Sequence, residues 1–283
     1  MKQQLTPASI AENDNLRSAA MRRLIQSPAT PPPAAREGAI PPVLVQFWDN
    51  LATLPTDVQH CLDSWEPLTH QGFSRHLFDE PQAFAFITAS CEPDHAQAFL
   101  RCTHPAMKCD YFRLCYLYYH GGFYVDADER YQGADCRSFV QDGRLKIQPL
   151  CYDTRTDEMV SAEVFMRQRR HAGEWIYYVN NNPLIAPARH PVIGRALSRA
   201  TRQLLQPTTS DQSIQSIAGP GNLTASLVMH ALAAAPDAVS DFCILPNWDA
   251  VSVSPWPLSY RNDERNWRVW EANQIGHHPS FTH

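Results

Sequence analysis

The chain has 283 residues, of which 44% are hydrophobic and 19% are charged, and its net charge is −5. These values exclude a wholly disordered or fibrous chain and argue against a strongly basic nucleic-acid-binding protein. No apolar stretch reaches the roughly 18 residues that would suggest a transmembrane helix. The N-terminal segment has no apolar signal-peptide region, so we expect a cytoplasmic protein whose eight cysteines are reduced and mostly buried.

The first 38 residues differ in composition from the rest of the chain. They are polar, rich in Ala, Ser and Gln, and end in a Pro-rich run over 27–33. Such a segment buries too little apolar surface to offset the entropy of ordering it. We therefore predict a disordered tail over 1–38, with one short helix over 16–25, and a single folded domain over 39–283. A secretion or partner-docking tail is the alternative interpretation.

Hydrophobic runs bounded by Pro, Gly and Asp predict alternating strands and helices, which indicates an α/β sheet with parallel strands in the first half. The predicted strands are 43–48, 73–78, 123–125, 175–179, 184–186 and 242–245. The predicted helices are 57–65, one capped by Asp79, 92–100, 105–120, 190–205, and one capped by Asn222 or Thr224 that reaches Ala233. The C-terminal tail is expected to be irregular.

The strongest chemical signal is Asp126-Ala127-Asp128, directly after the short strand 123–125. Alternation along an extended chain puts both carboxylates on one side, at the strand end where α/β sheets bind ligands. A hard divalent cation such as Mg²⁺ or Mn²⁺ suits this pair, and Glu129 adds a third acid nearby. An acidic turn facing solvent is the alternative.

A second signal lies in the mostly apolar helix 105–120. Asp110 and Arg113 stand three residues apart and therefore on one face of that helix. Charged groups in a buried helix need partners. The two side chains either form an internal ion pair or are held at a binding site, where they hydrogen-bond a polyhydroxylated ligand.

Residues 109–128 contain C-D-x-x-R, then G-G-x-Y-x-D-x-D, at the spacing of a known family. This block resembles the DXD-containing sugar-binding region of glycosyltransferases. That family includes outer-chain α-mannosyltransferases, capsular polysaccharide transferases and, more distantly, the large glucosylating toxins. The segments 40–48, 181–191, 219–224 and 277–278 resemble it more weakly. Val45 stands where the family usually has His, and the family's late tryptophans are absent.

The resemblance implies a GT-A fold, in which a Rossmann-like mixed sheet is flanked by helices, and retention of anomeric configuration. It implies that Asp126 and Asp128 bind Mn²⁺ or Mg²⁺ and, through it, the donor diphosphate, with His278 or His277 completing the metal shell. The expected catalytic set is Asp110, Arg113, Asp126 and Asp128. The expected donor contacts are Trp48, Asp110, Arg113, Tyr124, Asp126, Asn181 and Asn182, with Trp48 near the base.

The sequence therefore predicts a metal-dependent hexosyltransferase that uses a UDP- or GDP-sugar donor and a glycan or lipid-linked acceptor, with cytoplasmic or peripheral membrane location. Alternatives are a secreted effector that glycosylates a protein, an inactive nucleotide-sugar-binding module, and a non-catalytic metal-binding protein built on Cys and His. No motif identifies the donor sugar or the acceptor.

Overall fold

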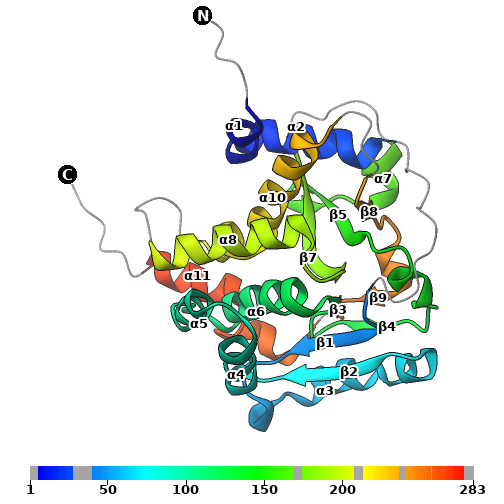
Figure 1. Ribbon diagram of the computed structural model, residues 1–283, viewed down its shortest axis with the longest axis vertical. Coiled ribbons are helices and arrows are strands. Elements are labelled where there is room, and N and C mark those ends of the chain that lie inside the picture. Colours follow the sequence, from blue (N-terminus) through cyan, green and yellow to red (C-terminus); the bar gives the residue numbers. More distant parts are fainter. Residues whose placement is uncertain are drawn as a thin grey trace, which may run out of the picture.

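The computed structural model describes residues 6–27, 40–167, 174–206, 213–235, 240–255 and 257–276. Its centre is a seven-stranded mixed sheet in the order β2–β1–β3–β7–β5–β6, with β8 paired to β5 (Figure 1). A separate ribbon joins β4 to β9. The strands are β1 (Val43–Phe47), β2 (Ser74–Phe78), β3 (Gly122–Tyr124), β4 (Arg130–Tyr131), β5 (Leu145–Asp153), β6 (Glu158–Met159), β7 (Trp175–Ala186), β8 (Phe242–Ile244) and β9 (Ser252–Val253).

Helices cover both faces of this sheet. The α-helices are α1 (Pro7–Glu12), α2 (Asp14–Gln26), α3 (Thr56–Asp63), α4 (Glu80–Ser90), α5 (Pro93–Leu100), α6 (Pro105–His120), α7 (Ala162–Arg167), α8 (Pro191–Leu205), α9 (Ile214–Ile217), α10 (Pro220–Ala233) and α11 (Trp267–Gly276). Short 3₁₀ turns are η1 (Leu51–Thr53), η2 (Glu66–Gln71), η3 (Arg137–Val140), η4 (Trp248–Ala250) and η5 (Ser259–Asn262). Within the described ranges, none of the helices combines the length and apolar character that a membrane span requires.

Alternating side chains along the central strands divide the core into two layers. Val45 and Tyr124 pack into the larger core under α6 and α8, whereas Leu44 and Phe123 face a smaller core around Trp65. Because the side chains on both faces of these strands are buried, other elements must pack on both sides of the sheet. The expected α/β class, with a mixed sheet flanked by helices, is confirmed.

The first half of the sheet has the expected parallel pairing. β1 lies between β2 and β3, parallel to both, so the chain leaves all three strands at the same edge of the sheet. β7 then runs antiparallel to β3 and β5 and makes the sheet mixed. The segment after β3 is thereby placed beside the end of β1 and against the middle of β7, and this arrangement positions the candidate site.

Helix α6 has the bounds that the sequence predicted. Pro105 occupies its first turn, and the imidazole of His104 accepts a hydrogen bond from the Ala106 N–H. Gly121 ends the helix with φ +70°, and a Cβ there would lie 2.6 Å from the Ala188 nitrogen. Only glycine fits both the backbone conformation and the close approach, so the turn from α6 into β3 depends on it.

Several elements differ from the predictions. β5 was not predicted, because the alternation over 145–153 includes Lys146, Gln148 and a central Pro149 at a bulge. β7 is one continuous strand rather than two. α10 begins at Pro220 with Gly219 as its cap, earlier than expected, and the C-terminal tail contains η5 and α11.

Part of the N-terminal segment, residues 6–27, is described and is mostly helical. The helix expected over 16–25 is present within α2, and α1 precedes it. Ala11, Met21 and Ile25 are buried in the larger core, where α1 packs on α10 and α2 packs on β7. Burial of these few apolar side chains stabilises the segment enough to offset the entropy of ordering it, although its overall composition is polar. Residues 1–5 and 28–38 of the predicted tail lie outside the described residues.

Candidate functional site

The candidate site is centred on the acidic segment that follows β3. The Val125 N–H donates to Val45 O over 3.1 Å, which extends the pairing with β1 by one residue. At Asp126 the chain leaves the sheet, and its N–H donates to Asn182 Oδ1 over 3.0 Å. The Asp126 side chain is 29% exposed and that of Asp128 is 16% exposed. Both carboxylates are thus held at the surface end of a buried strand.

Arg113 connects this segment to α6. Its guanidinium forms ion pairs with Asp110 Oδ1 at 2.7 Å and Asp126 Oδ1 at 2.8 Å, and donates to Asn181 O over 2.6 Å. The ring of Tyr124 lies 4.4 Å from the guanidinium carbon. With a side chain only 3% exposed, Arg113 is a buried cation shared by two carboxylates, and its pKa is raised by Asp126.

Asp110 is the member of this pair that reaches the surface, with 11% of its side chain exposed. Its Oδ1 also accepts a hydrogen bond of 2.8 Å from Asn181 Nδ2. Its Oδ2 faces Gly219 at the start of α10, where a Cβ would lie 3.1 Å away. Burial raises the pKa of Asp110 to about 6 although Arg113 opposes the shift.

Asp128 is held by the C-terminal part of the chain. Its Oδ2 accepts hydrogen bonds from Tyr260 Oη and Arg261 Nη2, each at 2.6 Å. The ring of Tyr260 meets Trp48 edge to face, with centroids 5.3 Å apart. Turn η5 therefore packs across the second carboxylate and beside the end of β1. Because this contact spans 132 residues of sequence, no local signal predicted it.

Glu129 is the third acidic residue of the segment, after Asp126 and Asp128, and its side chain is buried. Its two carboxylate oxygens accept hydrogen bonds from Asn182 Nδ2 at 3.1 Å and Ser252 Oγ at 2.6 Å, and its carbonyl accepts one from the Trp65 indole. Burial raises its pKa to about 8. Glu129 is 8% exposed, so it positions the turn after Asp128 and offers little surface to a ligand.

The free oxygens of the two aspartates fit a divalent cation. Asp126 Oδ1 and Asp128 Oδ2 carry the bonds described above, whereas Asp126 Oδ2 and Asp128 Oδ1 accept no hydrogen bond from a described residue. One oxygen from each of two carboxylates is the protein share typical of Mg²⁺ or Mn²⁺ that also binds phosphate and water. No cluster of three His, Cys, Asp or Glu occurs within the described ranges, and His277 and His278 lie outside them.

The structure brings most of the predicted residues together. Asp110, Arg113, Asp126, Asn181 and Asn182 form one hydrogen-bonded network, in which both asparagine amides are engaged by the protein's own groups. Asp128 lies two residues beyond Asp126, and Tyr260 links it to Trp48.

Tyr124 differs from the prediction of a donor contact. It is fully buried, and its hydroxyl bonds to Cys109 Sγ at 2.8 Å. It supports Arg113 from behind and offers no surface to a donor.

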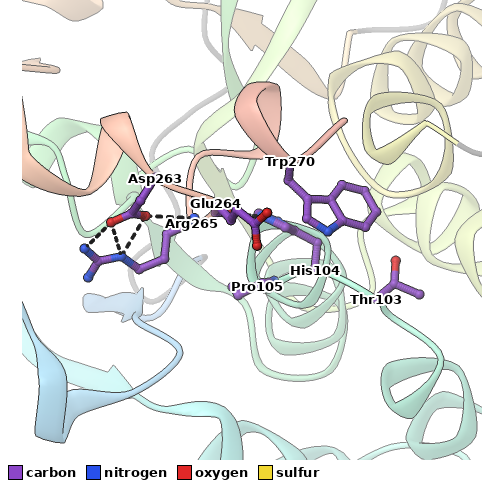
Figure 2. A pocket seen from close by; sticks show the side chains of 7 residues that line it. All are labelled: Thr103, His104, Pro105, Asp263, Glu264, Arg265 and Trp270. Carbon is purple, nitrogen blue, oxygen red and sulfur yellow. Dashed lines mark hydrogen bonds and ion pairs between the residues drawn. The ribbon is translucent and has the colours of Figure 1, made fainter. Parts of the chain in front are cut away.

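A pocket of about 500 Å³ lies at the start of α6. Figure 2 shows it between the start of α6 and the C-terminal segment, lined by Thr103, His104, Pro105, Asp263, Glu264, Arg265 and Trp270. The His104 ring tilts against Trp270, with centroids 5.1 Å apart. Each wall continues along the chain into the cluster, since α6 leads to Asp110 and residue 263 follows η5.

Comparison with known proteins finds one family model that matches part of the chain. Residues 55–133 match the family model described as the glycosyltransferase sugar-binding region containing the DXD motif. Among solved structures, the chain is similar to one titled "PaToxG Glycosyltransferase", with 15% identity, a TM-score of 0.44 and coverage of 94% of each chain. No curated protein matches the sequence. The segment from α3 to the residues after β4 is thus similar to a sugar-binding region of glycosyltransferases.

Proposed function

We propose that this protein is a divalent-cation-dependent glycosyltransferase that moves a sugar from a nucleotide-sugar donor to a hydroxyl group of a glycan or lipid-linked acceptor. The observation that carries the proposal is the pair Asp126 and Asp128. Each has one oxygen fixed by a basic or hydroxyl donor and one that accepts nothing from the described residues, and the pair adjoins Asp110 within a segment that matches a sugar-binding region.

Asp126 and Asp128 would hold the cation through their free oxygens. When bound, Mn²⁺ or Mg²⁺ stabilises the negative charge that develops on the departing nucleoside diphosphate. Arg113 keeps Asp126 in place. Burial raises the pKa of the Asp126 carboxyl, and the guanidinium of Arg113 opposes that rise because it favours the charged form. Asn182 fixes the backbone of Asp126, so the position of the carboxylate does not depend on the ligand.

Asp110 would accept hydrogen bonds from donor sugar hydroxyls. Its carboxylate has an edge at the surface, whereas Arg113 is nearly inaccessible and acts by holding Asp110 and Asp126 apart at a fixed spacing. Trp48, half-buried at the end of β1, would stack on the base, a contact worth about 1–3 kcal/mol. Donors of both the UDP and GDP classes suit this arrangement.

The pocket of Figure 2 would receive the acceptor, because one wall begins α6, which carries Asp110, and the other follows η5, which holds Asp128. Trp270 supplies an aromatic wall, and Glu264 with Asp263 supplies oxygens for hydroxyl groups. Replacement of Trp270 by Ala is expected to raise the KM for the acceptor while leaving hydrolysis of the donor unchanged.

The experiment that tests the proposal is hydrolysis of a panel of nucleotide-sugars with Mn²⁺ or Mg²⁺. Slow release of nucleoside diphosphate from one donor, lost on addition of EDTA and in Asp128→Asn, supports it. The matched control is Asp135→Asn, an exposed aspartate that pairs only with Arg137 and should retain activity. Donor binding without turnover, even with glycan, lipid-linked and protein acceptors added, would point to a binding module. The proposal would be overturned if no donor were bound and none were turned over.

A further inference from the structure

A second cavity, of about 560 Å³, lies between α1 and α8. None of the residues of the carboxylate cluster lines it. Four arginines do: Arg189, Arg195, Arg199 and Arg202. The only acidic residue in its lining is Glu12, so the cavity is strongly cationic although the chain as a whole has a net charge of −5.

The arginines converge from a helix face and the loop before it. Arg195, Arg199 and Arg202 follow the spacing i, i+4, i+7 and therefore share one face of α8. Arg189 precedes the helix, with its guanidinium carbon 4.3 Å from the centroid of the Tyr119 ring. Like charges at these spacings repel one another, so an anion bound among them would relieve that repulsion.

Three of these arginines have no carboxylate partner within the part of the chain that the structure describes. Arg189, Arg195 and Arg202 form no ion pair with a carboxylate of the described residues, in contrast to Arg199. Arg195 is the clearest case, because its Nε is buried without a hydrogen-bond partner and its Nη1 reaches only the sulfur of Met229, at 3.5 Å. A buried N–H without an acceptor is costly, and an incoming oxyanion would satisfy it.

Glu12 shows how an oxyanion fits this cavity. Its two oxygens face the two terminal nitrogens of Arg199, with Nη2 to Oε2 at 3.3 Å and a closer contact between Nη1 and Oε1. Hydrogen bonding to Arg199 lowers the pKa of Glu12, and the charge of Arg202 adds to that effect. The carboxylate thus occupies a bidentate position that a phosphate group also suits, since the guanidinium fork matches both.

We propose that the cavity between α1 and α8 binds a ligand with several phosphate groups. The charge balance of four arginines against one carboxylate favours a multiply charged anion over a single carboxylate. The volume lies within the range of about 300–1,000 Å³ that small-molecule sites occupy. Phosphate is the shared chemistry, and it can come from a free oligophosphate or from a phosphorylated lipid headgroup. The proposal is independent of the proposed glycosyl transfer.

The test is calorimetric titration of the full chain with tripolyphosphate in EDTA, which keeps a cation-dependent diphosphate site from contributing. Binding should weaken at least tenfold in Arg195→Gln/Arg202→Gln. It should be unchanged in Arg137→Gln/Arg155→Gln, two arginines that pair with carboxylates outside the cavity. Glu12→Gln should bind more tightly than the wild type, because it releases Arg199, and a gain of affinity cannot arise from misfolding.

A second arm uses vesicles of phosphatidylcholine with and without a phosphatidylinositol phosphate. Binding to the phosphorylated vesicles that weakens in Arg195→Gln/Arg202→Gln supports the proposal with a lipid headgroup as the source. Binding to tripolyphosphate alone supports it with a free ligand. Absence of binding to both, or equal binding by the wild type and Arg195→Gln/Arg202→Gln, would overturn it.

Discussion

Replacement of Arg113 by Met tests whether the buried ion network holds the site together. Arg113 lies 2.7 Å from Asp110 Oδ1, 2.8 Å from Asp126 Oδ1 and 2.6 Å from Asn181 O, with 3% of its side chain exposed. Met keeps much of the side-chain volume, so packing changes little. The two carboxylates and the carbonyl, however, lose their shared donor in a region that excludes water.

The size of the effect follows from this geometry. Removal of one partner from a buried ion pair costs about 3–5 kcal/mol, because an uncompensated charge remains. For a domain of this size, each kcal/mol shifts Tm by roughly 2–4 °C, so we expect Arg113→Met to lower Tm by about 6–20 °C. Urea unfolding should give the corresponding fall in the free energy of unfolding.

Two further variants make the result interpretable. Arg137→Met, which removes an arginine 64% exposed and paired only with Asp135, should leave Tm unchanged within error. Arg113→Met combined with Asp110→Asn should be more stable than Arg113→Met alone, since it removes one of the unpaired carboxylates. Equal losses in Arg113→Met and Arg137→Met, or a further loss in the double variant, would refute the reasoning.

Three other predictions follow from the site and the helix caps. Arg261→Gln should tighten Mn²⁺ binding about fivefold in calorimetry, because it removes a cation from Asp128, and weaker binding would contradict the assigned ligand. Trp48→Ala should raise the Kd for the nucleoside diphosphate roughly 5- to 150-fold, the range that base stacking supplies, and an unchanged Kd would remove Trp48 from the base site. His104 and His190 each accept a backbone N–H at Nδ1 at the start of a helix, and burial lowers both pKa values below 6.5. The unfolded chain therefore binds the protons first, so stability should fall as pH drops below about 6.5, and the slope should be shallower in His104→Asn and His190→Asn if this assignment holds.

The sequence contained enough to predict the first half of the sheet and one side of the site. Pro105 and the glycines after His120 punctuate α6, and the apolar runs of β1 and β3 are long enough to stand out. Asp110, Arg113, Asp126 and Asp128 then come close together because α6, a tight turn and β3 are consecutive in the chain. Local spacing alone fixes such a unit.

The other side of the site depended on contacts that are distant in sequence. Tyr260 and Arg261 reach Asp128 from a region whose composition predicted only an irregular tail. β5, α1 and the packing of α2 on the core were missed for a related reason. Pro149 interrupts the pattern of β5, and α1 and α2 are ordered by a few buried side chains that pack on α10 and β7. Tertiary contacts outweigh local propensity in these elements.

The measurement that tests the central claim most directly is binding of nucleoside diphosphate with and without Mn²⁺. If Asp126 and Asp128 hold the cation that carries the donor, UDP or GDP should bind tightly only with Mn²⁺. That dependence should be lost in Asp128→Asn and kept in Asp135→Asn. Binding that is equally tight in EDTA, or that survives in Asp128→Asn, would contradict the account.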